Sequence, residues 1–166
     1  MTIVRRITAG DARLLRDIRL RALATDPRSF GSTHEREAAY TDEEWQAWCD
    51  EDAEGNDVTT LLALRGDHAV GIVSGARDDE DTDVYDVFAM WVDPDARGTG
   101  VGRRLLTELE DWMRSAGGKT SRLSVTNEAH AARALYESAG YEPDGRVTPS
   151  RHTEGLVEVG LRKRLV

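Results

Sequence analysis

The sequence predicts one domain with a mixed α/β fold, and three observations lead to this. The chain has 166 residues, the usual size of a single domain, so we expect residues 1–166 to form one. Stretches with strand and helix patterns follow one another in the order β-α-α-β-β-β-α-β-α-β-β. Strands and helices alternate regularly only in the second half, which favours a mixed sheet over a fully parallel one.

The chain begins with the pattern of a short strand, residues 2–7. Thr8 and Asp11 then have the S/T-x-x-D spacing of a capping box, and apolar residues recur after them at helical spacing. Pro27 ends the predicted helix, because the residue before a proline leaves the α region. Residues 30–40 show no clear pattern.

A second helix is predicted to begin at Thr41, which forms another capping box with Glu44. Its apolar residues include Trp45, Trp48 and Cys49. Because Cys49 is the single cysteine, an internal disulfide and a thiolate metal cluster are excluded, and we expect a buried structural thiol rather than a nucleophile. The four histidines lack the spacing of metal ligands, so we expect no metal.

Three strands are predicted in the middle of the chain. Residues 59–64 and 69–74 flank Gly66 and Asp67, which indicates a hairpin with a loop longer than the tightest turns. Residues 84–92 are the most apolar strand, and apolar side chains on both faces favour a central position. Simple alternation places Asp86, Phe88, Met90 and Val92 on one face, and Val87, Ala89 and Trp91 on the other.

The second half alternates helices with strands. A helix over residues 105–113 is expected to end at Gly117. Another helix is expected to be capped by Asn127 or a near neighbour and to have Gly140 at its C′ position. The strands of this half are expected at residues 122–126, between Tyr141 and Val147, and at residues 156–161.

Charge and hydropathy exclude several classes of partner. The net charge of −9 argues against nucleic acid, whose binding needs an electropositive face, and suits a cationic substrate. No stretch approaches the ~18 consecutive apolar residues of a membrane span. The N-terminal residues contain no apolar signal-peptide core, so we expect a cytoplasmic protein without membrane association.

The strongest local motif is Arg97-Gly98-Thr99-Gly100-Val101-Gly102, between the apolar strand and a helix. Glycines remove Cβ atoms, and a helix N-terminus exposes free N–H groups, so the segment suits an anion such as a pyrophosphate. The G-x-G-x-G spacing, with no acidic residue near Arg122, excludes a dinucleotide fingerprint. Met113 stands where a P-loop ending at Lys119 would need its first glycine, which excludes that motif. A plain glycine-rich turn is the alternative.

Two blocks of the sequence carry a family resemblance. Residues 91–106 contain the motif above and end in Leu105-Leu106, and residues 132–141 contain Leu135-Tyr136 and Gly140-Tyr141. They resemble the acetyl-CoA motif R/Q-x-x-G-x-G/A and the later block L-Y-x-x-x-G-F/Y of the GNAT (Gcn5-related) N-acetyltransferases. The resemblance covers essentially the whole chain. It implies the GNAT fold, with a central, mostly antiparallel sheet of six to seven strands and about four flanking helices.

The resemblance also implies acetyl-CoA as co-substrate. The backbone of Met90, Trp91 and Val92 would pair with the pantetheine arm. The family often has an asparagine seven residues before its tyrosine, where this chain has Ala129, so either Asn127 replaces that contact or it is absent. The pyrophosphate loop would comprise Arg97, Gly98, Thr99, Gly100, Val101, Gly102 and Arg103.

Catalytic roles follow from the same resemblance. The Met90 N–H would face the thioester carbonyl, and Tyr136 matches the family tyrosine beside the sulfur, often the general acid. Asp86 stands where many members carry a glutamate that acts as base or binds the amine, although a structural role at the start of the strand is equally open. Glu35 and Glu37 are rival carboxylates, because their segment overhangs the acceptor site in this family.

We therefore expect an N-acetyltransferase that moves an acetyl group from acetyl-CoA directly to a primary amine, on a small molecule or a peptide, in a ternary complex. The alternative is a non-catalytic acyl-CoA-binding regulatory module on the same fold, and the presence of Tyr136 favours the enzyme. The identity of the amine stays open, as does the choice of Asp86, Glu35, Glu37 or water as the base. A homodimer is one option for the assembly.

Overall fold

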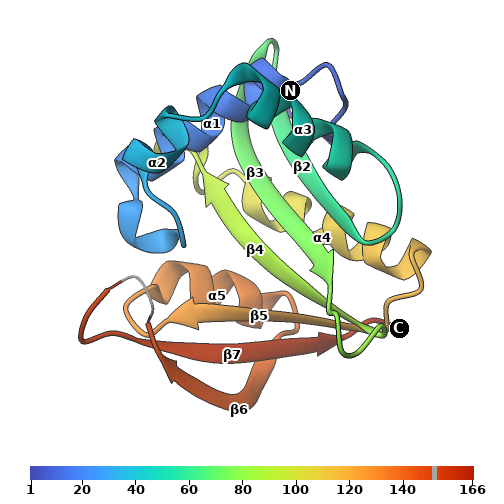
Figure 1. The fold of residues 1–166 in the computed structure, drawn as a ribbon. Helices are drawn as coiled ribbons and strands as arrows, with labels where there is room; N and C mark the ends of the chain where they lie inside the picture. Colours follow the sequence, from blue (N-terminus) through green and yellow to red (C-terminus); the bar gives the residue numbers. More distant parts are fainter. Residues whose placement is uncertain (151–152) are drawn as a thin grey trace.

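Seven strands form one sheet, in the order β1-β2-β3-β4-β5-β7-β6, in the computed structural model, which describes residues 1–150 and 153–166 (Figure 1). Every neighbouring pair is antiparallel except β4 and β5. This confirms the predicted mixed, mostly antiparallel sheet. The strands are β1 (Ile3–Arg6), β2 (Val58–Arg65), β3 (His68–Arg77), β4 (Val84–Val92), β5 (Thr120–Thr126), β6 (Glu142–Pro149) and β7 (Val157–Arg164).

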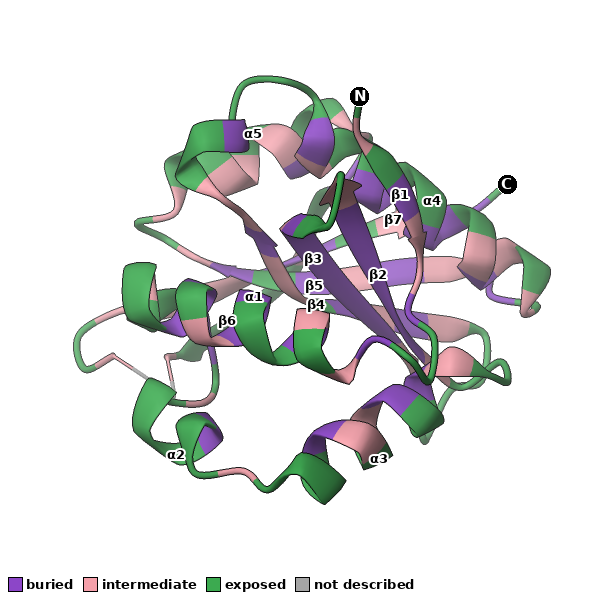
Figure 2. Ribbon diagram, turned by 90° about the horizontal axis from the view of Figure 1, so that it is seen from above, coloured by how far each residue is buried: buried purple, intermediate pink, exposed green. Residues whose placement is uncertain are grey.

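Helices cover both faces of the sheet (Figure 2). On one face lie α1 (Ala12–Thr25), α2 (His34–Ala38) and α3 (Asp42–Ala53), and on the other lie α4 (Val101–Ser115) and α5 (His130–Ser138). The short helix α2 falls in the segment for which the sequence pattern predicted nothing. The described residues therefore hold five α-helices where about four were expected.

Two apolar cores result from this layering, one on each face of the sheet. The first joins α4 and α5 to the sheet through residues such as Leu105, Leu109 and Tyr136. The second joins α1 and α3 to the sheet and contains Trp45 and Cys49. Cys49 is fully buried there, as predicted, and burial raises the pKa of its thiol to about 11. Helices on both faces of β2, β3 and β4 place these strands at the buried centre of the molecule.

The two predicted capping boxes have different outcomes. Thr41 accepts from the Glu44 N–H and Glu44 accepts from the Thr41 N–H, both at 3.1 Å, which confirms the second box. The first prediction is wrong, because α1 begins at Ala12 with Asp11 as its N-cap. Thr8 and Asp11 form a turn before the helix instead, and Asp11 also accepts two hydrogen bonds from Arg5. This pairing with Arg5 lowers the pKa of Asp11 to about 2.

The β2–β3 hairpin is tighter than predicted. Arg65 pairs with His68, so only Gly66 and Asp67 form the turn. The strand patterns ended early at Leu64 and Ala69 because both ends of the hairpin carry polar residues. Gly66 has a φ of 59°, the positive value that tight hairpin turns require and that glycine adopts without strain.

A β-bulge in β4 overturns the predicted faces of that strand. Between the pairs Ile72–Trp91 and Ser74–Phe88, β4 contains one more residue than β3, and Ala89 has a φ of 53°. The extra residue reverses the alternation. Met90 and Val92 therefore pack with Val87 against the α4 core, whereas Ala89 and Trp91 pack on the α1 side. The bulge lies beside the site described below.

Helix α4 approaches β3 closely because two glycines remove side chains at the contact. A Cβ atom on Gly71 would lie 2.8 Å from Cδ1 of Leu105, and one on Gly75 would lie 2.9 Å from Cδ1 of Leu109. These contacts are shorter than van der Waals packing allows. The two glycines thus set the distance between the helix that follows the glycine-rich loop and the centre of the sheet.

We predict that Gly71→Val lowers the free energy of unfolding by about 1–3 kcal/mol, because a larger side chain overpacks a close-packed core. Urea unfolding followed by circular dichroism measures the change. Gly10→Val is the matched control, since a Cβ atom there approaches nothing closer than 3.7 Å. Equal stability of the two variants would contradict the packing role of Gly71.

Candidate active site

The glycine-rich loop leaves backbone N–H groups open at the start of α4. Gly98 and Gly100 have φ values of 75° and 86°, and a Cβ atom on either would meet nothing within 4 Å. Gly100 is the N-cap of α4 and provides no side-chain cap, so the N–H groups of Val101, Gly102 and Arg103 are left without intrahelical partners. The positive end of the helix dipole adds to these donors. The loop can therefore hold an anion, as the sequence predicted.

Gly102 has a different role from the other two glycines. A Cβ atom there would lie 3.1 Å from Cδ2 of Leu135 on α5 and 3.6 Å from Cγ2 of Val92 on β4. The absence of a side chain at this position lets the first turn of α4 pack closely on both neighbours. Gly102 thus draws the loop, the end of β4 and helix α5 together.

Side chains around the loop hold its shape. The Arg97 guanidinium donates to the Val92 carbonyl at 2.9 Å and to Asp26 at 2.8 Å, and the Trp91 indole donates to the same Asp26 oxygen at 2.7 Å. Arg103 reaches Ser138 on α5 at 2.5 Å. Both arginines of the motif are therefore already bonded within the protein. The backbone amides, rather than these side chains, are the free donors of the loop.

Strands β4 and β5 are paired only at their beginnings. Residues 84–86 pair with residues 120–122, and beyond them β4 has no strand partner on this edge within the described residues. Figure 1 shows the two strands diverging from this end of the sheet. The divergence exposes the edge of β4 that carries the bulge.

Backbone alternation decides which groups of β4 this open edge presents. Asp93 donates to Val70 on the β3 side, and Trp91 is paired with Ile72, so both turn toward β3. Val92, and Met90 by the same alternation, turn to the open edge. Of the stretch expected to pair with the pantetheine arm, Met90 and Val92 thus present their backbone groups to the open edge, whereas Trp91 presents its own to β3. Its indole instead fixes the end of α1 through Asp26.

A cavity of about 130 Å³, here called the α5 cavity, lies between the diverging strands and α5. Tyr136 lines it, together with Met90 and Ala89 of the bulge. The Tyr136 side chain is 7% exposed, and none of the described residues forms a hydrogen bond with its hydroxyl. Burial raises the pKa of Tyr136 to about 12, so the phenol keeps its proton at neutral pH. A neutral, unpartnered phenol is thus placed beside the open edge of β4.

The C-terminus of α5 holds Tyr136 in place through a Schellman motif. The Gly140 N–H donates to the Glu137 carbonyl, and the Tyr141 N–H donates to the Tyr136 carbonyl at 3.0 Å. Gly140, at C′ with a φ of 100°, confirms the predicted helix stop. The rings of Tyr136 and Tyr141 pack edge to face with centroids 6.0 Å apart, and Tyr141 is bonded to Ser121 of β5 at 2.7 Å. The tyrosine is therefore anchored to the sheet.

A second, wider pocket of about 490 Å³, here called the β4 pocket, adjoins the α5 cavity. Phe88 lines both spaces and is 46% exposed. Trp48 and Phe30 form an aromatic wall, and Asp86 and Glu158 supply carboxylates. The two spaces share Ser29, Val87, Phe88, Ala89, Ser124 and Glu158.

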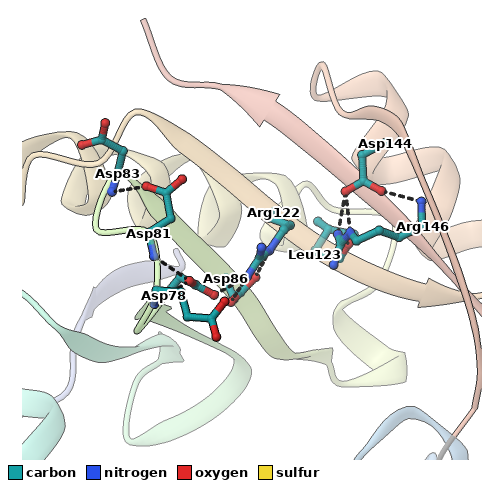
Figure 3. Close-up of polar contacts among 9 residues, drawn as sticks. Asp78, Asp81, Asp83, Asp86, Arg122, Leu123, Asp144 and Arg146 are labelled. Carbon is teal, nitrogen blue, oxygen red and sulfur yellow. Dashed lines mark hydrogen bonds and ion pairs between the residues drawn. The ribbon is translucent and has the colours of Figure 1, made fainter.

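Asp86 lines the β4 pocket but is engaged in an ion-pair cluster (Figure 3). Arg122 of β5 donates to both Asp86 oxygens, at 2.6 and 2.8 Å, and to Asp78 at 2.6 Å. Hydrogen bonding to Asp86 raises the pKa of Arg122, and backbone N–H groups together with Arg122 lower the pKa of Asp78. The cluster carries a net charge of −1, and it closes the end at which β4 and β5 meet.

Of the two rival carboxylates, Glu37 is buried and Glu35 is exposed. Arg19 donates to both oxygens of Glu37, at 2.9 and 2.6 Å, and the Arg19 guanidinium lies over the rings of Phe30 and Trp48. The geometry therefore does not suit the role expected of Glu37, because both of its oxygens are occupied. Instead, Glu37 holds the arginine that supports the aromatic wall. Glu35 lines neither the α5 cavity nor the β4 pocket.

Asn127 does not occupy the position that the sequence analysis gave it. Its side-chain oxygen accepts from the Val157 N–H at 3.3 Å, so it joins the beginnings of β7 and α5. The N-cap of α5 is Ala129, a near neighbour of Asn127, and it makes no side-chain capping hydrogen bond. Of the two predicted alternatives, a near neighbour rather than Asn127 itself therefore begins the helix. Ala129, rather than Asn127, lines the α5 cavity.

Glu158 is the residue that the sequence analysis missed. The sequence predicted a strand over residues 156–161 and assigned no role to Glu158, which alternates there with Val157 and Val159 as a solvated residue does. The structure pairs Glu158 with Thr126 of β5 and turns it into both spaces. Only the divergence of β4 from β5 makes this face of β7 part of a pocket.

Other features of the described residues lie apart from these two spaces. A hollow of about 540 Å³ beside α1 and the β2–β3 turn contains Arg21 and Asp93, which pair with each other at 2.6 Å. No group of three or more histidine, cysteine, aspartate or glutamate side chains in residues 1–150 and 153–166 could hold a metal ion. Over the same residues, no helix combines the length and hydropathy needed to cross a membrane.

Comparisons with known proteins agree with this geometry. The sequence model of the Acetyltransferase (GNAT) family matches residues 19–141. Mycothiol acetyltransferase of Beutenbergia cavernae is 32% identical over 128 residues, which are 73% of this chain and 40% of that relative. The chain spans at most 40% of the length of this and two further curated relatives.

Solved structures show the same fold. An acetyltransferase of the GNAT family from Streptococcus pneumoniae has a TM-score of 0.86 and 22% identity, with 100% of both chains covered. A Salmonella typhimurium acetyltransferase structure with its cofactor acetyl-CoA has a TM-score of 0.81 and 17% identity, covering 100% of this chain and 95% of that one.

We predict that Glu37→Ala lowers the free energy of unfolding by about 3–5 kcal/mol, because it leaves the buried Arg19 guanidinium without its partner. Glu35→Ala, on the same helix but exposed, should change stability by less than about 1 kcal/mol. Urea unfolding of both variants tests the difference. A Glu37→Ala protein as stable as Glu35→Ala would show that the pair contributes nothing to the fold.

Proposed function

Because the chain belongs to the GNAT acetyltransferase family, we propose that it transfers the acetyl group of acetyl-CoA to a primary amine. The observation that supports this proposal is that three features adjoin one another. The open amides of the glycine-rich loop stand at the start of α4, the unpaired edge of β4 begins beside them, and the α5 cavity with Tyr136 follows. A long acyl thioester with an anionic end fits such a sequence of sites.

The loop suits the pyrophosphate of acetyl-CoA. Its amides from Gly98 to Arg103 need no side chain to reach a phosphate oxygen, and two of its glycines leave the approach open. The backbone groups of Met90 and the N–H of Val92 would then pair with the pantetheine arm as an added strand would. The Val92 carbonyl is already bonded to Arg97. Acetyl-CoA enters the reaction as a substrate that supplies the acetyl group.

Direct transfer requires only groups that this chain already brings together. The amine attacks the thioester carbon, and the Met90 N–H on the open edge stabilises the oxyanion that forms. Tyr136 then gives its proton to the leaving thiolate. Its raised pKa supports this role, because the acid must keep its proton until the C–S bond breaks. Holding both substrates side by side lowers the barrier without a covalent enzyme intermediate.

Charge in the β4 pocket supports a cationic acceptor. The cluster of Asp78, Arg122 and Asp86 has one more negative than positive charge, and the whole chain carries −9. An acidic surface raises the local concentration of an ammonium group. The aromatic wall of Phe30 and Trp48 suits an apolar portion of the same molecule. We therefore place a primary amine on a small molecule or a peptide in this pocket.

The proposal is tested by free-thiol release from acetyl-CoA in the presence of an amine panel. The panel should contain alkylamines, diamines, amino sugars and a peptide with a free N-terminus. Turnover with any of these, together with the acetylated product by mass spectrometry, supports the enzyme. Binding of acetyl-CoA without turnover on any of them would favour the alternative, a non-catalytic acyl-CoA-binding module.

We predict that Gly100→Val raises the dissociation constant of acetyl-CoA at least about tenfold, which is ~1.4 kcal/mol. The valine both obstructs the open loop and resists the φ of 86°. Gly55→Val is the matched control, because Gly55 has a φ of 81° and equally open surroundings outside the site. Calorimetry on both folded variants measures the affinity, and equal affinity for acetyl-CoA would exclude the loop as its site.

We predict that Tyr136→Phe lowers kcat by about 10²–10⁴-fold, the usual contribution of a general acid, while acetyl-CoA affinity changes little. The control is Tyr85→Phe, which removes a hydroxyl bonded to Asn56 and Arg77 and so reduces stability instead. Steady-state kinetics decides between them. A kcat of Tyr136→Phe within about twofold of the original would mean that water protonates the thiolate.

A further inference from the structure

Glu158 occupies a junction that no other acidic side chain of the described residues shares. It lines both the α5 cavity, which contains Tyr136, and the β4 pocket, which contains Asp86. It stands on β7, the second strand from one edge of the sheet, opposite Thr126 on β5 and Thr148 on β6, and it is half-buried. Its backbone is therefore held by two neighbouring strands, at a position that lines both spaces.

The other carboxylates near these spaces are already bonded. Arg122 occupies both oxygens of Asp86, and Arg19 occupies both oxygens of Glu37. Asp52, in a neighbouring hollow with Trp48, accepts from the Trp48 indole and from Thr60 at 2.6 Å. Within residues 1–150 and 153–166, no ion pair or side-chain hydrogen bond involves the Glu158 carboxylate. Both of its oxygens are free to accept a proton.

We propose that Glu158 is the catalytic base, taking a proton from the ammonium form of the acceptor amine directly or through one water. This deepens the proposed function and rests on it. An alkylammonium group, with a pKa near 10.4, has no lone pair with which to attack until it loses that proton. A base must stand within hydrogen-bond reach of the nitrogen or one water away, and the junction lies between the amine's pocket and the thioester.

The protons balance as follows. The ammonium nitrogen loses one proton to Glu158, which passes it to solvent, and the free lone pair forms the C–N bond. The nitrogen of the tetrahedral intermediate loses a second proton as the C–S bond breaks. Tyr136 donates a proton to the sulfur and regains one from that nitrogen through water. One proton thus ends on coenzyme A and one in solvent, and no oxidant or reductant takes part.

Charged groups from several elements line the same two spaces as Glu158. Asp86 stands on β4 with Arg122 as its partner, and Arg19 stands on α1 with Glu37 as its partner. Arg28, in the turn Pro27–Ser29, lines the α5 cavity and pairs loosely with the exposed Glu128 at 3.3 Å. Tyr136 on α5 is neutral below pH ~11, because burial holds its pKa near 12. The phenol therefore keeps its proton at and below neutral pH, so it is not the group that accepts the proton of the ammonium.

The test compares Glu158→Gln with Glu142→Gln, which removes the same charge from an exposed position on the adjacent strand β6, outside both spaces. The substrate is the fastest amine of the panel above, and kcat/KM is measured from pH 6 to pH 10. Glu158→Gln should lower kcat/KM at least about tenfold near neutral pH, with recovery as the pH approaches the pKa of the amine. Glu142→Gln should follow the original profile.

Further variants distinguish Glu158 from Asp86 as the base. Asp86→Asn should keep the shape of the pH profile if Asp86 only contributes charge. If Glu158→Gln does not fold, Glu158→Asp retains a carboxylate and should keep turnover near neutral pH with a reduced kcat. Full activity of folded Glu158→Gln at every pH would overturn the proposal, and so would a loss of kcat/KM near neutral pH in Asp86→Asn but not in Glu158→Gln. Absence of turnover by the unmodified protein on every amine would instead overturn the proposed function.

Discussion

The whole site depends on one constraint, the short parallel pairing of β4 and β5. The two strands are hydrogen-bonded only over residues 84–86 and 120–122, where Arg122 bridges Asp86 and Asp78. Beyond that point the chains diverge. The divergence leaves one edge of β4 without a strand, makes room for Tyr136 between β4 and α5, and exposes Glu158 of β7 on the other face. A fully paired β4–β5 ladder would close both spaces.

The bulge at Ala89 works together with this divergence. By inserting one residue opposite β3, it turns Met90 and Val92 toward α4 while Phe88 and Ala89 stay on the pocket side. The loop after β4 then leads directly into α4, whose first turn is drawn against β4 and α5 by Gly102. The open amides, the free strand edge and the phenol are therefore held by three packed elements rather than by flexible loops. Such rigidity is what preorganised catalysis requires.

Ion pairs with arginine determine which carboxylates near the site can still accept a proton from a substrate. Arg19, Arg97 and Arg122 are each bonded to an aspartate or glutamate that lines or supports the site. A carboxylate with both oxygens held by a guanidinium is stabilised in its charged form, which makes it a weaker proton acceptor for a substrate. Among the described residues that line the two spaces, Asp86 has such a partner and Glu158 is the carboxylate without one.

The sequence by itself determined the features that depend on near neighbours along the chain. The capping box of Thr41, the stop at Gly140 and the open loop around Gly100 each involve residues within a few positions, and the structure contains all three. The order of elements also follows from local periodicity. The two family blocks predicted the fold and located the tyrosine, because they combine several such local patterns in a fixed order.

Only the tertiary structure decided which faces and which charges meet. The reversed faces of β4 arise from its pairing with β3. The alternation of side chains along one strand cannot show that this strand has one residue more than its partner, which is what a β-bulge is. The partners of Asp86 and Glu37 lie 36 and 18 residues away in the sequence. Glu158 has the pattern of a solvated strand residue, and it lines a site because β4 leaves β5. These outcomes depend on contacts between segments that are distant in the sequence. Such contacts form only when strands pair and side chains pack in the folded chain.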